Sequence, residues 1–179
     1  EDVATDEELA QIIEKEVESL QKFQSTPAYV MSRAMNEFYA DVVAIILSQN
    51  PKAIYTSLKG ENKDKIRDST MIRDFSQSYG PSVLSGWEKY ANKLILEKQY
   101  GSLYYFALAP LRGMTWELIK GPVQNPAHHA QLAQAIYMAL LEDFEQRFSK
   151  EIKFSQFDIK KYNIELQIKI KQKLIKAGF

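Results

Sequence analysis

The feature that most constrains the fold is a continuous apolar and aromatic run, Leu103–Ala109, which ends at Pro110. A helix that is apolar on every side needs neighbours on every side. The run makes only about two helical turns, far short of the roughly 20 residues that a membrane span needs. The segment from Ser102 to Gly121 is therefore predicted to be a central helix with the other elements packed around it.

Pro110 is expected to kink or interrupt this helix, because it cannot donate the backbone hydrogen bond to the carbonyl of Phe106. Gly113 supports the same expectation. Arg112 lies between these two residues. If the break lies inside the fold, Arg112 needs an acceptor, which a carbonyl, a carboxylate or an anionic ligand can supply.

The residues around this break allow two interpretations. In the first, Tyr104, Tyr105, Arg112 and Trp116 line a pocket for an amphipathic ligand. In the second, Arg112 faces solvent and the aromatic side chains are ordinary core. The first interpretation makes a small-molecule or lipid-binding protein the alternative to the function favoured below.

Capping residues, prolines and glycines divide the rest of the chain into further helices. Thr5 and Glu8 form a capping box, and Asn125-Pro126 begins a helix whose apolar face is Ala130, Ala133, Ile136, Tyr137, Leu140, Leu141, Phe144 and Phe148. The other expected helices are 6–24, 27–49, 51–59 stopped by Gly60, 69–79 stopped by Gly80, and one from Pro81 that includes Ile95.

Residues 155–177 are ambiguous. Alternation of apolar and polar residues from Tyr162 to Ile170 is typical of a strand, but a strand here would lack a sheet, because no other segment alternates in this way. We therefore predict a helix, starting at Ser155-x-x-Asp158 and ending at Gly178. It would carry two separate apolar stripes: Ile159, Tyr162, Leu166, Ile170 and Leu174 in the first, and Ile164, Ile168 and Ile175 in the second.

Composition excludes several chemistries. The absence of cysteine removes disulfides, thiolate nucleophiles and cysteine-ligated metals. The only histidines, His128 and His129, are adjacent and cannot grip one metal ion from a helix face. No catalytic or phosphate-binding motif is present, so we expect no metal or cofactor and no catalytic residues.

Glu37 and Asp41 lie one helical turn apart and could share a proton or hold a cation. We prefer the interpretation in which Arg33 neutralises Glu37 and both carboxylates face water.

Charge is balanced overall but not locally. Residues 1–18 carry eight acidic groups against Lys15, whereas residues 150–176 carry eight lysines against three acidic groups. We interpret these as two solvated helix faces that could pair with each other, and keep two opposite partner surfaces as the alternative. The lysines alone give no reason to expect nucleic-acid binding.

These observations predict an all-α protein, one domain over residues 1–179 with 1–4 frayed, built as an irregular bundle of seven or eight helices. The favoured function is non-enzymatic protein–protein interaction, as an adaptor, chaperone or assembly subunit, or by self-association. It rests on the surplus stripe Ile164, Ile168 and Ile175, with Lys160 and Lys171 beside it. We expect no transmembrane segment and a cytoplasmic location by default, with export after signal removal left open.

Overall fold

A computed structural model of the chain describes residues 5–61, 73–77 and 80–179. These residues form α-helices joined by short turns and contain no strand, which confirms the predicted all-α class. The helices are α1 (Asp6–Gln24), α2 (Pro27–Ser48), α3 (Ala53–Glu61), α4 (Pro81–Leu96), α5 (Tyr100–Phe106), α6 (Ala109–Ile119), α7 (His129–Arg147) and α8 (Ile159–Lys176). Short 3-10 turns, η2 to η4, join α6 to α7 and α7 to α8.

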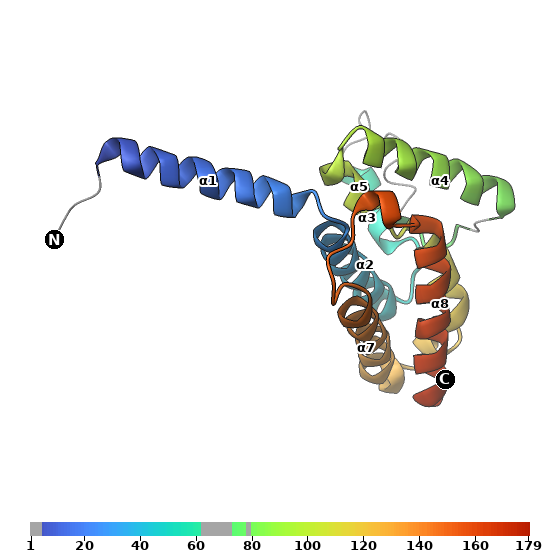
Figure 1. Cartoon of the computed structure of the whole chain (residues 1–179). Coiled ribbons are helices and arrows are strands. Elements are labelled where there is room, and N and C mark those ends of the chain that lie inside the picture. The colour runs from blue at the N-terminus through green and yellow to red at the C-terminus, as the bar shows by residue number, and fades with distance from the viewer. Residues whose placement is uncertain (1–4, 62–72, 78–79) are drawn as a thin grey trace.

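One hydrophobic core holds the helices together, except α1. Side chains from α2, α4, α5, α6, α7 and α8 form it, with Phe75 stacked on Phe38 of α2 at 6.2 Å between ring centroids. Helix α7 contacts both α2 and α8, and α6 also packs on α8. Helix α1 contributes no core residue and projects away from this body (Figure 1).

The predicted central segment is two helices. The chain breaks at Ala107-Leu108, so that Pro110 is the second residue of α6, where a missing N–H costs nothing. The expected interruption is confirmed, but Gly113 lies inside α6 and plays no part in it. The buried part of the segment also differs from the predicted one. Residues Ala107–Gly113 are buried throughout, whereas Tyr105 is 38% exposed, so the aromatic half of the run is not covered on all sides.

Two side chains satisfy the carbonyls that this break releases. The Phe106 carbonyl, which Pro110 cannot pair, accepts a hydrogen bond from the Trp87 indole of α4 at 2.7 Å. The Ala107 carbonyl accepts from the buried amide Nδ2 of Asn163 on α8 at 2.8 Å. Buried carbonyls need such donors, so α4 and α8 are tied to the break by specific bonds as well as by apolar packing.

Replacing Asn163 with alanine is expected to lower the free energy of unfolding by about 1–3 kcal/mol, because the Ala107 carbonyl loses a donor inside the core. Urea titration followed by circular dichroism measures the loss. Gln172→Ala, at an exposed position of the same helix, is the control and should change stability by less than about 0.5 kcal/mol. Equal effects of the two substitutions would contradict the role given to Asn163.

Several helix ends follow the predicted local chemistry. The Thr26 hydroxyl caps α2 by accepting from Tyr29 N at 3.2 Å, and Asn125 accepts from Ala127 N at 3.1 Å. Gly178, at φ 91°, closes α8, and Phe179 N donates to the Leu174 carbonyl at 3.0 Å. The capping box of Thr5 depends on the side chain of Glu8, and the structure describes only the backbone of that residue.

Other boundaries differ from the predictions. Helix α8 begins at Ile159 with Asp158 as its cap, while Ser155 lies in the preceding 3-10 turn. Gly60 falls inside α3. Within the expected helix 69–79, residues 73–77 form a 3-10 end and a turn, and the remaining positions lie outside the described residues.

The inward face of α7 is rotated from the predicted one. Ala130 and Tyr137 are exposed, whereas Ile136 and Leu140 are buried as predicted. The buried residues are Leu132, Ala135, Ile136, Ala139, Leu140 and Asp143. Small alanines face inward because α7 is packed against α2 and α8 together.

Candidate protein-interaction surfaces

Helix α1 exposes a complete apolar face. Its periodicity is the usual signal of a packed helix, yet each large apolar side chain on it is 45–60% exposed. These side chains, called the α1 face below, are Leu9, Ile12, Ile13, Val17, Leu20 and Phe23. Contiguous exposed apolar faces of this kind are often interaction sites in proteins, so the α1 face is a candidate site.

The attachment of α1 to the body is narrow. The Phe23 ring meets Tyr29 of α2 edge-on at 5.4 Å, and the Ser25 hydroxyl donates to the Lys22 carbonyl at 2.7 Å. An isolated helix of this length is marginally stable in water, and most helix stability in proteins comes from packing of the apolar face. A partner that covers the α1 face would supply that missing packing.

Glu16 lies in the middle of the α1 face. At 100° per residue it projects between the directions of Ile12 and Ile13, one turn before Leu20. No ion pair joins Glu16, Glu14 or Glu18 to another described residue. A partner that covers the α1 face must therefore also supply a cation to Glu16, because a buried unpaired carboxylate is costly.

Helix α8 carries the second exposed apolar surface, as its two stripes differ in burial. The first stripe, from Ile159 to Leu174, is buried as the helical pattern indicates. The outer stripe is exposed: Ile164 by 42%, Ile168 by 50% and Ile175 by 60%. The structure thus separates a core stripe from a surface stripe on this helix.

The lysines of α8 differ in what they contact. Lys160, predicted to belong to the partner surface, donates to Glu88 of α4 at 2.9 Å, and Lys169 meets Asp143 of α7 at 2.7 Å. Lys173 pairs with Glu142. Lys171 lies between Ile168 and Ile175 along the sequence and, at 100° per residue, projects at the edge of the outer stripe next to Ile164. No ion pair engages it within the described residues.

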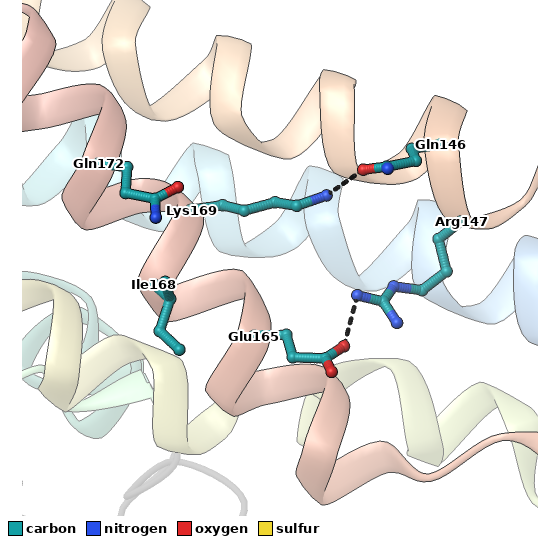
Figure 2. Close-up of a pocket in the computed structure, with 6 residues that line it drawn as sticks. All are labelled: Gln146, Arg147, Glu165, Ile168, Lys169 and Gln172. Atoms are coloured by element: carbon teal, nitrogen blue, oxygen red, sulfur yellow. Dashed lines mark hydrogen bonds and ion pairs between the residues drawn. The ribbon is translucent and has the colours of Figure 1, made fainter.

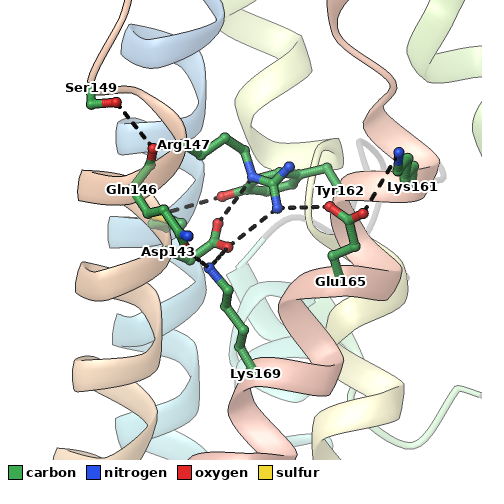
Figure 3. A network of polar contacts seen from close by, with 9 residues as sticks. Asp143, Gln146, Arg147, Ser149, Lys161, Tyr162, Glu165 and Lys169 are labelled. Carbon is green, nitrogen blue, oxygen red and sulfur yellow. Dashed lines mark hydrogen bonds and ion pairs between the residues drawn. The ribbon is translucent and has the colours of Figure 1, made fainter.

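A buried carboxylate joins α7 to α8 behind this stripe. Asp143 is fully buried and receives Lys169 and, at 3.4 Å, Arg147, which also bonds Glu165 at 2.8 Å (Figure 3). The Arg147 guanidinium lies over the Tyr162 ring at 4.8 Å. Burial raises the pKa of the Tyr162 hydroxyl well above 10.0, and the negative charge of Asp143 raises this pKa further.

This shift predicts an alkaline loss of stability. In the unfolded chain Tyr162 ionises near pH 10.0, whereas the folded protein holds it neutral, so above pH 10 the unfolded state loses its proton first. Tyr162 should then lower the free energy of unfolding by up to about 1.4 kcal/mol per pH unit, until the folded pKa is reached. Tyr162→Phe should reduce the slope measured by urea titration between pH 9 and 11.5, and an unchanged slope would contradict this assignment.

A surface hollow of about 470 Å³ adjoins the outer stripe (Figure 2). Its lining residues are Gln146 and Arg147 of α7 with Glu165, Ile168, Lys169 and Gln172 of α8. Lys169 reaches across it to the Gln146 side chain at 2.7 Å. Ile168 therefore stands at the edge of a hollow with a polar rim, which suits an apolar side chain entering from a partner.

Arg112 is buried rather than solvent-facing. Its guanidinium donates twice to Oδ2 of Asp41, from Nε at 3.0 Å and from Nη2 at 2.8 Å. Asp41 is also fully buried and receives Arg73, whose Nε lies 3.1 Å from Oδ1. The acceptor that Arg112 needs is thus a carboxylate of this chain.

The preferred interpretation of Glu37 and Asp41 is wrong in two respects. Asp41 does not face water, and the cation beside Glu37 is Arg73 at 3.5 Å, while Arg33 lies over the Tyr104 ring at 5.6 Å. Burial alone would lower the pKa of Arg73, but its hydrogen bond and charge contact with Asp41 raise it overall. These contacts fix Arg73 and Arg112 as cations around one carboxylate.

The other predicted pocket residues lie apart from this cluster. Tyr104 and Tyr105 contact each other at 4.2 Å between ring centroids, and a hydrogen bond between them raises the pKa of Tyr105. Tyr104 lines a surface hollow with Lys22 and Tyr29, and Trp116 packs, half-buried, on the core. A ligand at these four residues stays a prediction.

Within the described ranges, no three histidine or acidic side chains come together in a way that could hold a metal ion. None of the helices described here is long and apolar enough to cross a membrane. The sequence matches no protein-family model, and no curated protein or solved structure gives a significant match, so the function must be argued from the residues of this chain.

Proposed function

We propose that this chain acts by binding another protein chain through the α1 face. The observation that carries the proposal is a helix whose six large apolar side chains are all about half-exposed and whose body contacts leave them uncovered. Covering these side chains would contribute hydrophobic free energy and would stabilise a helix that is marginal by itself. In this helix-in-groove mode of recognition, apolar side chains three and four positions apart on the helix insert into a groove of the partner.

A protein partner fits the α1 face better than a lipid surface does. Helices that lie on membranes carry lysine and arginine on the polar face, which attracts anionic lipids. Helix α1 has six acidic residues against Lys15 and Lys22, a net charge of −4. An anionic bilayer would repel it, whereas a basic protein surface would attract it.

Site-specific photo-crosslinking tests the proposal. A photoreactive amino acid replaces either Ile12 or Leu20 on the α1 face, and in parallel controls either Gln11 or Glu18 on the opposite face, in cells that express the full chain. We expect protein adducts from the first pair at least tenfold above the controls. The added change Ile13→Ser should abolish most of them, because it removes a neighbouring contact.

Equal labelling from both faces of α1, or adducts that Ile13→Ser leaves unchanged, would overturn the proposal. The same crosslinked cells also test the membrane alternative, because lipid adducts differ from protein adducts in mass. Adducts with lipid and none with protein would replace protein binding with membrane binding.

A further inference from the structure

We infer that the α1 face docks on the outer stripe of α8 in a second copy of this chain, so that two copies exchange their α1 helices. The inference rests on the proposed function and names its partner. Each copy carries one exposed α1 face and one exposed outer stripe, Ile164, Ile168 and Ile175. A two-fold pair therefore makes the same contact twice and leaves neither surface uncovered.

The two surfaces lie apart within one chain. Helix α1 points away from the body, and α8 packs on α4, α6 and α7 (Figure 1). The acidic and basic ends of the sequence, interpreted above as solvated helix faces that could pair with each other, are thus not joined in this arrangement. A second copy brings them together without any change in the fold of either body.

Charge complementarity favours this contact. Helix α1 has a net charge of −4, and α8 carries six lysines against Glu165, a net charge of +5. Opposite potentials of this kind raise association rates and select the partner face. Pairing of α1 with α1 of another copy would instead bring two acidic helices together, with one Glu16 facing the other.

The patterns along the two surfaces also match. On α1, Glu16 stands between Ile13 and Leu20, three residues from the first and four from the second. On α8, Lys171 stands between Ile168 and Ile175 with the same spacings. Opposing Glu16 to Lys171 therefore sets apolar side chains against each other on both sides of the ion pair, whichever direction the helices run.

The lengths are compatible. From Leu9 to Phe23 the α1 face extends about 21 Å, and the outer stripe from Ile164 to Ile175 extends about 17 Å, at about 1.5 Å per residue. One α1 helix thus covers the whole stripe. It also passes the hollow beside Ile168, which can receive one of its apolar side chains. The single ion pair fixes the register of an otherwise apolar contact, as polar residues do in coiled coils.

Light scattering and analytical ultracentrifugation on the purified full chain test the inference. We expect a concentration-dependent dimer of the 20.6 kDa chain. Glu16→Lys and Lys171→Glu should each weaken the dimer at least tenfold, because each places like charges inside the contact. The double variant with both changes should recover most of the affinity, since every α1 then meets a complementary α8.

Matched controls carry the same charge changes outside the contact. Glu18→Lys lies on the opposite face of α1, and Lys150→Glu is an exposed position outside α8, so each should change the dissociation constant by less than threefold. Sensitivity to Glu16→Lys without sensitivity to Lys171→Glu would overturn the inference in favour of contact between two α1 helices. Failure of the double variant to recover would overturn it as well.

A monomer at all concentrations would overturn self-association. The crosslinking result would then decide whether the α1 face binds a different protein. Adducts from the α1 face to a different protein would then keep the function and replace the partner. Absence of both dimer and protein adducts would remove the function together with the inference.

Discussion

Asp41→Ala is expected to lower the free energy of unfolding by about 3–5 kcal/mol. Asp41 is fully buried and pairs with Arg112, which is 1% exposed, so removing the carboxylate takes away the anion that accepts two hydrogen bonds from a buried guanidinium. Arg73 would lose the same carboxylate but keeps access to water and to Glu37. Most of the loss should therefore come from Arg112.

Urea titration at neutral pH measures this loss. Glu37→Ala is the matched control, because it removes a partly exposed carboxylate that forms an ion pair with Arg73, and it should cost less than about 1 kcal/mol. Replacing both buried partners, as Asp41→Leu with Arg112→Met, should recover most of the stability, since an apolar pair needs no compensation. An Asp41→Ala loss below about 1 kcal/mol would show that this ion pair does not hold the core.

The contacts of Arg112 show which part of the ion-pair cluster can be predicted from the sequence. The proline and glycine around Arg112 indicated that it needs an acceptor if buried. The acceptor lies 71 residues away, on a different helix. A helical pattern relates residues three and four positions apart, so it places Asp41 beside Glu37 on α2 and gives no link to Arg112. Only tertiary packing brings the two charges together.

The predictions that rest on a few neighbouring residues, such as helix caps, agree best with the structure. Thr26 and Asn125 cap helix starts through their side chains, and Gly178 closes α8 through its positive φ, because a cap depends on a few neighbouring atoms. The inward face of α7 depends on two packing helices at once, and the sequence pattern misplaced it. The aromatic residues Tyr104 and Tyr105 look like core by composition but lie at the edge of the body.

Helix α1 shows the clearest difference between the burial that the sequence pattern predicts and the burial in the structure. Its periodicity predicts a helix with a buried face, and the helix is present with that face exposed. Periodicity reports that a surface suits burial but not which chain buries it. Only the exposed fractions of these side chains show that the chain leaves the face uncovered.

The two stripes of α8 provide the second large effect. Leu166→Ala, in the core stripe, is expected to lower the free energy of unfolding by about 2–5 kcal/mol, because it removes a fully buried side chain and leaves a cavity. Ile168→Ala, two residues later in the outer stripe, removes a half-exposed side chain and should change stability by less than about 0.5 kcal/mol. Both are measured by urea titration at protein concentrations low enough for the chain to be monomeric, because dimers add concentration-dependent stability.

The same pair of substitutions separates folding from binding. At high concentration, Ile168→Ala should weaken self-association while circular dichroism stays unchanged, and Ile164→Asp with Ile168→Asp should abolish it at unchanged helicity. Leu166→Ala should instead act on the fold. If Ile168→Ala destabilised the monomer as much as Leu166→Ala, the outer stripe would be part of the core and could not receive a partner. The ratio of the two losses of stability therefore decides whether the outer stripe belongs to the core or to the surface of the protein.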